Sequence, residues 1–405
     1  MTRFFLELNL VETLSLAALL YFAGRGGLAL FPFLQKRNIP APVIGGLFFA
    51  CLAAALQNGQ WLRFRLDTAL QSPLMIAFFT TIGLEASLDL LKRGGSQMIR
   101  LLLLSSLIAV LQNLLGLFLA GSLQLPPLVG LICGSITLMG GPATGAAFGQ
   151  LLEQQHGVPG AVTLAMAAAS FGILSAGFLG GPAATRLIQM RKLVPGEVDG
   201  SKGKEVPTAG PGPRESRPGE AGYEAMKAMA LVLILMWAGS WFGSWTNRYF
   251  TLPAYVGAML LAALFRNLND RYLWLPYCPS TIRCLGSVSL SLFLSMVLMS
   301  MRLQDLAHLL LPMLVILFLQ AAVMTLCAYW ITFAWMGKDY CAAVMVAGHI
   351  GFGLGTTANA MANMDALAER FGAAPRAFLV LPIVGAFFID FTNSLIITAF
   401  IHWSK

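Results

Sequence analysis

Two glycine-rich stretches decide the fold of this chain. Residues 134–146 read GSITLMGGPATGA, and residues 348–359 read GHIGFGLGTTAN. Glycine runs interrupt a helix because they add backbone freedom and tolerate positive φ. Inside a bilayer, the N–H and C=O groups that such a break frees need a partner from protein, water or a ligand. Each stretch is therefore a candidate binding site or, in the alternative interpretation, a seam where small residues let helices pack closely.

The composition indicates an integral membrane protein. Of the 405 residues, 57% are hydrophobic and 11% are charged, whereas soluble domains average roughly 45–50% and about 25%. The net charge of +8 comes without a basic patch interleaved with aromatic residues, which argues against a nucleic-acid partner. The six cysteines include no CxxC motif, so we interpret them as small apolar residues and not as metal ligands or disulfides.

Apolar windows of transmembrane length recur along both halves of the chain. The predicted spans lie near residues 8–33, 41–57, 72–91, 99–121, 159–188, 225–246, 252–266, 285–303, 307–335 and 377–401. Two further apolar segments, at about 127–152 and 342–367, contain the glycine-rich stretches and break at their centres. We therefore predict an all-α membrane protein with two re-entrant hairpins.

The two halves of the chain resemble each other. Residues 39–43 (IPAPV) align with residues 252–256 (LPAYV), 213 positions apart, and the same offset pairs Gly140 with Gly353 and Thr144 with Thr357. Internal repeats of this kind are typical of secondary transporters. The predicted domains are a five-span repeat over 1–190, a flexible linker rich in glycine and proline over 191–224, and a second five-span repeat over 225–405.

An odd number of spans in each repeat places the two repeats in opposite orientations. With both termini outside, most of the 26 lysines and arginines fall on the cytoplasmic side, as the positive-inside rule requires. The linker is then cytoplasmic, and the first apolar run is interpreted as a retained span and not as a signal peptide. The first hairpin enters from outside and the second from the cytoplasm, so we expect the two breaks to meet near the midplane.

Ionisable residues inside a membrane are costly and mark candidate sites. Asp390 lies well inside the last span, and Asn393 follows on the same helical face. We predict a functional pair; the alternative is a carboxylate neutralised by neighbouring helices or by a proton. His349 could contact substrate or protons, or it could be a hydrogen-bonded packing residue.

Other polar residues within the spans have more ordinary interpretations. Glu85 and Asp89 lie close to Lys92 and Arg93, and interfacial salt bridges explain them best. Ser289 and Ser291 point to two different helical faces, so at most one of them can face a site.

In these residues and the motifs around them, the chain resembles the bacterial sodium/glutamate symporter family. The resemblance covers nearly the whole length outside the linker and rests on residues 39–42, 45–46, 77–84, 134–141, 289–294, 347–355 and 384–390. It implies Na⁺-coupled uptake of L-glutamate by two inverted five-span domains, each with a re-entrant loop. It also implies a homodimer in the bacterial cytoplasmic (inner) membrane. One departure is that residues 140–143 read GGPA where the family resembles Gly-Gly-x-Gly, and Pro142 stiffens this turn.

The predicted function is secondary-active, Na⁺-coupled symport of L-glutamate by an elevator-like form of alternating access, with lipid as the surrounding partner. Backbone N–H groups and threonines of the hairpins would bind carboxylate, and Asp390 would bind the substrate ammonium or Na⁺. The predicted substrate-binding residues are Ser135, Thr137, Gly140, Gly141, Thr144, Gly353, Gly355, Thr356, Thr357, Asn359 and Asp390. The predicted Na⁺ ligands are Asp390, Asn363, Asn393 and Gly351.

Three alternatives stay open. A citrate- or malate-type carboxylate symporter, coupled to Na⁺ or H⁺, would use the same architecture without a substrate ammonium. A passive channel would conduct without saturable uptake. An intramembrane enzyme is disfavoured because the chain has four histidines and no Ser/His or paired-Asp protease pattern.

Overall fold

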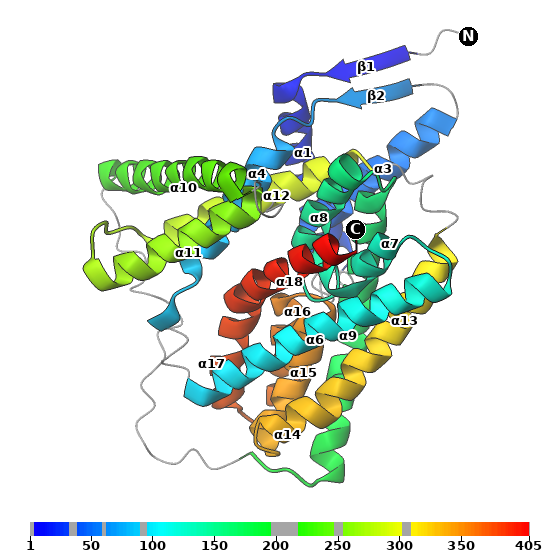
Figure 1. Cartoon of the computed structure of the whole chain (residues 1–405), viewed down its shortest axis with the longest axis vertical. Helices are drawn as coiled ribbons and strands as arrows, with labels where there is room; N and C mark the ends of the chain where they lie inside the picture. Colours follow the sequence, from blue (N-terminus) through cyan, green and yellow to red (C-terminus); the bar gives the residue numbers. More distant parts are fainter. Residues whose placement is uncertain are drawn as a thin grey trace.

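The structure is a computed structural model that describes residues 4–31, 39–58, 62–89, 95–195, 218–246, 254–301 and 309–404 (Figure 1). Its elements in chain order are β1 (Phe4–Leu8), α1 (Leu10–Leu30), α3 (Ala41–Asn58), β2 (Leu62–Leu66), α4 (Gln71–Glu85), α6 (Gly95–Ser122), α7 (Pro127–Leu131), η1 (Ile132–Ile136), α8 (Gly141–His156), α9 (Ala161–Met190), α10 (Pro218–Thr246), α11 (Ala254–Tyr272), α12 (Pro279–Met299), α13 (Leu310–Cys327), η3 (Ala328–Thr332), α14 (Phe333–Trp335), α15 (Tyr340–Leu354), α16 (Thr357–Phe371), α17 (Pro375–Ile383), η4 (Val384–Phe388) and α18 (Ile389–Trp403). The η elements are short π-helical stretches.

Helices occupy every range that the sequence analysis assigns to a span. Six of the described helices are both long and apolar enough to cross a membrane. They are Leu10–Leu30, Gly95–Ser122, Ala161–Met190, Gly222–Gly243, Pro279–Met299 and Leu310–Trp335. These helices confirm a helical membrane protein. Most of the predicted linker, residues 196–217, lies outside the described residues, and α10 already begins at Pro218, inside the range assigned to the linker.

A short pair of parallel strands adds to the helical prediction. Strands β1 and β2 pair in register, with Phe4 opposite Leu62 and Leu8 opposite Leu66. Apolar and charged residues alternate along β2, which is the period of a strand and not of a helix. The chain is otherwise helical, as expected, and these two five-residue strands add a small sheet to the predicted all-α class.

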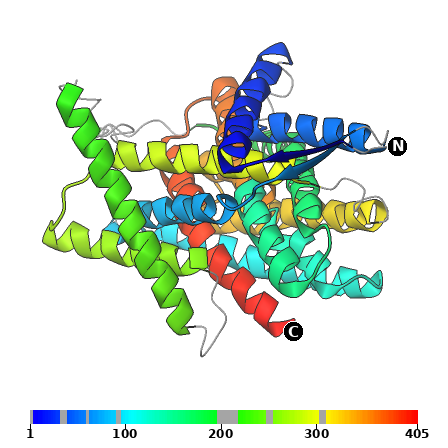
Figure 2. The same cartoon turned by 90° about the horizontal axis from the view of Figure 1, so that it is seen from above.

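The helices form two packing groups, and each group takes helices from both halves of the chain. The frame group contains α1, α3, α4, α10, α11 and α12, which pack mainly on one another. The hairpin group contains α6 to α9, α13 to α18 and the π-helical stretches, which also pack mainly on one another. Figure 2 shows α10, in green, crossing α11 at one edge of the molecule. A long seam separates the two groups.

Small residues allow the frame helices to approach closely. A Cβ atom on Gly24 of α1 would lie 2.0 Å from the carbonyl oxygen of Ala41, and one on Gly45 of α3 would lie 1.8 Å from that of Leu20. Glycines at such contacts let two helix backbones touch, as small-xxx-small seams do in membranes. Helix α1 begins with a capping box in which Asn9 and Glu12 each accept from the other's backbone N–H.

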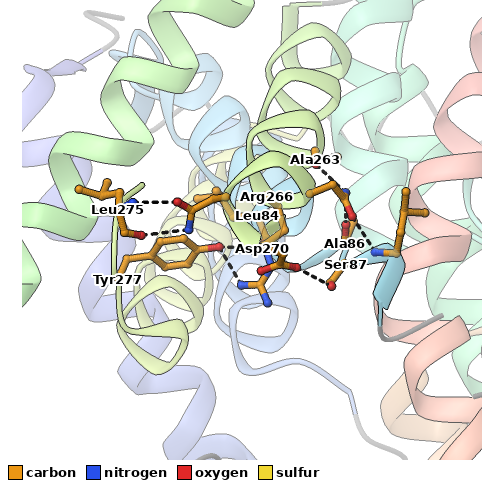
Figure 3. Close-up of polar contacts among 11 residues, drawn as sticks. Leu84, Ala86, Ser87, Ala263, Arg266, Asp270, Leu275 and Tyr277 are labelled. Atoms are coloured by element: carbon orange, nitrogen blue, oxygen red, sulfur yellow. Dashed lines mark hydrogen bonds and ion pairs between the residues drawn. The ribbon is translucent and has the colours of Figure 1, made fainter. Parts of the chain in front are cut away.

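A polar network joins α4 to α11 at the end of the frame group (Figure 3). Arg266 donates from Nε to Asp270 Oδ2 at 3.1 Å and from Nη1 to the Tyr277 hydroxyl at 2.7 Å. Ser87, just after α4, donates to the same Asp270 oxygen at 2.7 Å. Burial raises the pKa of the Tyr277 phenol, so this hydroxyl stays protonated and can donate to the Leu84 carbonyl at 3.4 Å.

The same network provides hydrogen-bond partners for the backbone groups that follow the end of α4. Asn267 of α11 donates to the Ala86 carbonyl at 2.9 Å and accepts from the Leu88 N–H at 2.7 Å. Glu85 lies beside Arg266 and Arg283 around a small cavity of about 80 Å³. The basic neighbours that the sequence suggested for Glu85, residues 92 and 93, lie outside the described residues.

Candidate functional site

A cavity of about 470 Å³ lies on the seam between the frame group and the hairpin group. We call it the central cavity. The frame group lines it with Tyr21, Pro40, Ala41, Pro42, Leu290, Ser291 and Leu294. The hairpin group lines it with Met139, Gly140, Pro142, Ala143, Phe352, Gly355, Thr356, Thr357, Ala358, Gly385 and Asp390. Its volume is within the range of small-molecule sites.

The first glycine-rich stretch forms one wall of the central cavity. The helix that enters as α7 and η1 loses helical geometry at Gly134, and a turn follows before α8 begins at Gly141. Gly141 has a φ of +65°, a conformation that favours glycine. Pro142 occupies the first turn of α8, where its missing N–H costs no hydrogen bond. The departure from Gly-Gly-x-Gly is therefore compatible with this turn.

The second glycine-rich stretch forms the facing wall. Helix α15 ends at Leu354, and α16 begins at Thr357 after Gly355 and Thr356. Thr356 is the N-cap of α16, and its hydroxyl accepts from the Asn359 N–H at 3.4 Å. The first turn of α16 lines the cavity, so the positive end of a helix dipole faces the space inside it.

The two breaks meet at the central cavity. A Cβ atom on Gly141 would lie 3.0 Å from the Gly355 carbonyl oxygen and 3.5 Å from the Thr356 methyl group. The two breaks therefore lie next to each other, as expected, while their entry from opposite sides and their place near the midplane stay predictions. Segments more than 200 residues apart thus build opposite walls of one site.

Asp390 lies where the last helix is irregular. The π-helical stretch η4 ends at Phe388, and Asp390 follows in the first turn of α18, half-buried and lining the central cavity. Stretches of π-helix are frequent at functional sites because they re-aim side chains and free backbone groups. Near it, Thr357 donates to the Gly385 carbonyl at 2.7 Å, which joins the second hairpin to this stretch.

Several predicted residues of the second hairpin hold helices together and do not line the central cavity. Asn359 donates to the Ile173 carbonyl at 3.2 Å, and Asn363 donates to the Ala176 carbonyl at 3.0 Å, so both amides connect α16 to α9. Gly351 allows α15 and α16 to touch, since a Cβ there would lie 2.4 Å from the Ala360 Cα. Their roles as ligands stay predictions.

The carbonyl of Gly353 also already has a hydrogen-bond partner within the protein. It accepts from Gln112 Nε2 of α6 at 2.9 Å. His349 is fully buried with both ring nitrogens in contact with hydroxyls, Nε2 at 3.1 Å from Ser105 Oγ and Nδ1 at 2.8 Å from Thr332 Oγ1. These contacts favour the packing interpretation of His349.

The predicted residues of the first hairpin divide in a different way. Gly140 lines the cavity and Gly141 forms its turn, whereas Thr137 donates to the Ile132 carbonyl at 2.6 Å and Thr144 is buried against Gly140. Ser135 lies deeper. It contacts Asn113 of α6 and Asn393 of α18.

Most frame residues of the cavity were not among the predicted site residues. Tyr21 carries no charge and belongs to no glycine break, and residues 39–42 were noted for the internal repeat and the family resemblance but not for a site. Of the two serines on α12, Ser291 lines the cavity and Ser289 does not, which confirms that at most one faces the site.

A second cavity lies farther along the same seam. It measures about 490 Å³ and we call it the rim cavity. Its lining includes Thr68, Gln71, Gln150, Glu153, Thr163 and Ser300. Gln71 of α4 donates to the Met296 carbonyl at 3.0 Å and accepts from Gln150 of α8 at 2.7 Å, so a buried amide pair bridges the two helix groups here.

Comparison with known proteins places the chain in a family. Residues 6–373 match the family model described as sodium/glutamate symporter. The sodium/glutamate symporter of Escherichia coli K12 is 40% identical over 396 residues, 98% of each chain, and that of Haemophilus influenzae is 36% identical over 388 residues, 95% of each chain. These relatives are named as transporters and not as enzymes. The chain belongs to the sodium/glutamate symporter family.

Proposed function

We propose that this protein is a secondary-active transporter that takes up L-glutamate together with Na⁺. The observation that carries the proposal is the central cavity, where two glycine-rich breaks, the start of α16 and the carboxylate of Asp390 face one space. Membership of the family and the names of its relatives support the same substrate and ion.

The lining of the central cavity suits an amino-acid zwitterion with an extra carboxylate. Helix N-termini bind carboxylates well, and the first turn of α16 presents one to the central cavity. The Thr356 and Thr357 hydroxyls donate to Asn359 Oδ1 and to the Gly385 carbonyl, both at 2.7 Å, and hold this turn in place. Asp390 supplies a negative group for the substrate ammonium. A citrate- or malate-type substrate would leave Asp390 without that partner, so the geometry favours an amino acid.

The coupling ion supplies the driving force. Glutamate has a net charge of −1 at neutral pH, so its uptake into a negative interior is electrically uphill. Each Na⁺ that moves inward contributes about 2.3 kcal/mol per 100 mV, in addition to its concentration gradient.

The seam suggests how access could alternate. We infer that the hairpin group moves against the frame group in an elevator-like manner, carrying the central cavity with it. Helix α12 lines both cavities, with Leu294 in the central cavity and Val297 in the rim cavity; three residues of helix correspond to roughly 4.5 Å along the seam, so the two cavities are neighbours. The Gln71–Gln150 contact would then have to break in each transport cycle.

The proposed topology follows from charge and duplication. It has ten spans in two inverted repeats, two re-entrant hairpins, both termini outside and a cytoplasmic linker in the bacterial inner membrane. In this arrangement the central cavity extends to Pro40–Pro42 on the cytoplasmic side, and the rim cavity opens outside. The homodimer and surrounding lipid remain part of the proposal.

Uptake into proteoliposomes tests the function. We expect concentrative uptake of labelled L-glutamate with an inward Na⁺ gradient and none with choline. Asp390→Asn should abolish it, and Asp365→Asn, a matched change at an exposed position of α16, should not. Uptake of citrate or malate in place of glutamate by the folded protein would contradict the proposal, and uptake that persists in Asp390→Asn would remove Asp390 from the site.

A further inference from the structure

Three buried polar atoms that have no hydrogen-bond partner among the described residues gather around one residue of the first hairpin. They are Ser135 Oγ, Asn393 Oδ1 and Asn113 Nδ2. The exposed fraction of each of these side chains is 1% or less. Unpaired polar atoms in a membrane interior cost free energy, so a cluster of them indicates a ligand.

Hydrogen bonds fix which atom each amide presents. The Ser135 N–H donates to Asn113 Oδ1 at 3.0 Å, which leaves the Asn113 amino group free. Asn393 Nδ2 donates to the Ser135 carbonyl at 3.0 Å, which leaves Asn393 Oδ1 free. The cluster therefore offers an amide oxygen, a hydroxyl and one N–H group at the junction of α6, η1 and α18.

We propose that Ser135 and Asn393 bind Na⁺ at this junction, and that the bound ion orders the glycine-rich turn facing the central cavity. The proposal rests on the function proposed above. Hydroxyl and amide oxygens are ligands of hard cations, and unwound backbone beside them, here at Gly134, is typical of Na⁺ sites in transporters. The Asn113 amino group cannot bind a cation; it can donate to a water molecule that completes the shell of the ion.

The nearest acidic residue along α18 supports a cation. Asp390 precedes Asn393 by three residues, so both lie on the same face of the helix. The rise between them is roughly 4.5 Å. A cation at Asn393 is thus close to the carboxylate that lines the central cavity, and the attraction between them is strong in this low-dielectric interior.

The backbone carbonyl of Ser135 links the proposed Na⁺ site to the wall of the central cavity. The Ser135 carbonyl accepts from Asn393 and also from the Gly140 N–H at 3.0 Å, and Gly140 lines the central cavity. Na⁺ held by Ser135 would hold this turn in the conformation that glutamate meets. By linkage, Na⁺ then raises glutamate affinity and glutamate raises Na⁺ affinity by the same factor.

The test compares two buried serines of the hairpin group. Ser135→Ala removes the free hydroxyl, whereas Ser394→Ala removes a fully buried hydroxyl that already donates to the Asp390 carbonyl at 2.7 Å. Two measurements are made on purified protein: the Na⁺ concentration for half-maximal glutamate uptake, and the rise in melting temperature when NaCl replaces choline chloride without glutamate.

We expect Ser135→Ala to raise the half-maximal Na⁺ concentration about 10-fold to 100-fold, as for lost partners of a bound metal ion, and to abolish the Na⁺-dependent rise in melting temperature. Ser394→Ala should behave as the wild type. If Ser135→Ala does not fold, Ser135→Cys keeps the volume but replaces oxygen by sulfur, and should show the same shift.

The outcomes separate this site from the function. A folded Ser135 variant with wild-type Na⁺ dependence and wild-type stabilisation overturns the site and assigns the cluster to trapped water. A wild-type protein that Na⁺ stabilises, and that loses this stabilisation in Ser135→Ala, but that takes up no glutamate would contradict the proposed function and support the site.

Discussion

The two hairpins are built from similar sequence but differ in how their polar groups are satisfied. In the second hairpin, Asn359 and Asn363 donate to carbonyls of α9, and both nitrogens of His349 contact hydroxyls. In the first hairpin, Ser135 Oγ has no partner, and neither has Asn393 Oδ1 beside it. The second hairpin is therefore held by hydrogen bonds within the protein. The first hairpin leaves polar atoms free, which fits the bound Na⁺ that we propose there.

The largest expected effect concerns α8, the helix of the first hairpin that contacts α4 of the frame group through Gln150. We expect that linking Gln71→Cys to Gln150→Cys with a short bis-methanethiosulfonate, which forms a reducible disulfide with each thiol, in a chain without other cysteines, reduces uptake to background. The two amides are bonded at 2.7 Å across the seam, so a covalent link would prevent the proposed movement. Reduction should restore uptake, and each single variant serves as a control. Full uptake in the cross-linked protein would show that this seam does not move.

A second pair of variants compares the packing of the two hairpins. Gly351→Ala would place a Cβ 2.4 Å from the Ala360 Cα and should destabilise the protein by about 3 kcal/mol, as overpacking does. Gly145→Ala of the first hairpin meets only a methyl group at 3.2 Å and should change stability by less than about 1 kcal/mol. Thermal unfolding in detergent measures both.

Gly181→Ala is the control for that pair, because a Cβ there would meet nothing within 4 Å. Equal losses of stability in Gly351→Ala and Gly145→Ala would mean that the second hairpin is no more rigid than the first.

A smaller effect is expected when a satisfied amide is removed from the second hairpin. Asn363→Ala leaves the Ala176 carbonyl without its donor at 3.0 Å and should cost about 2 kcal/mol of stability. The rise in melting temperature caused by Na⁺ should be unchanged, because this amide holds α9 and not an ion. Loss of that rise would make Asn363 a Na⁺ ligand, as the sequence analysis proposed.

The smallest effect is expected at the start of α16. Thr357→Val removes one hydroxyl, which donates to the Gly385 carbonyl at 2.7 Å and lines the central cavity. We expect the KM for glutamate to rise about 5-fold to 10-fold, the value of one hydrogen bond, because this bond holds the start of α16 in place beside the cavity. The Na⁺ effect on melting temperature should be unchanged. An unchanged KM would place the substrate carboxylate elsewhere in the cavity.

Local sequence was sufficient to predict the helices and their breaks. Apolar runs long enough to span a bilayer became helices, and the breaks at Gly140–Gly141 and Gly355 lie where the glycines are. The strand pair of β1 and β2 was missed because its two segments gain their hydrogen bonds only from each other, although residues 62–66 carry a visible alternation. Asp390 was predicted from the cost of a charge in an apolar span, and it does line the central cavity.

Sequence could not distinguish an asparagine with a free oxygen from one whose amide already holds two helices together. Asn363 was a Na⁺ candidate from its place just beyond the second glycine break, and Asn393 from its place on the same helical face as Asp390. The structure separates them, since Asn363 donates to Ala176 and Ala347 carbonyls while Asn393 leaves its oxygen free beside Ser135. Which atoms remain unpaired depends on neighbours that the local sequence does not contain.

By itself the sequence determined a helical membrane protein with two glycine breaks and a carboxylate within an apolar span, because hydropathy, backbone freedom and the cost of a charge in a membrane are local properties. Only the tertiary structure decided that the halves interleave into two helix groups and that a cavity lies on their seam. It also brought Ser135 to Asn393, 258 positions away. The reason is that hydrogen-bond partners and cavity walls are set by contacts between distant segments.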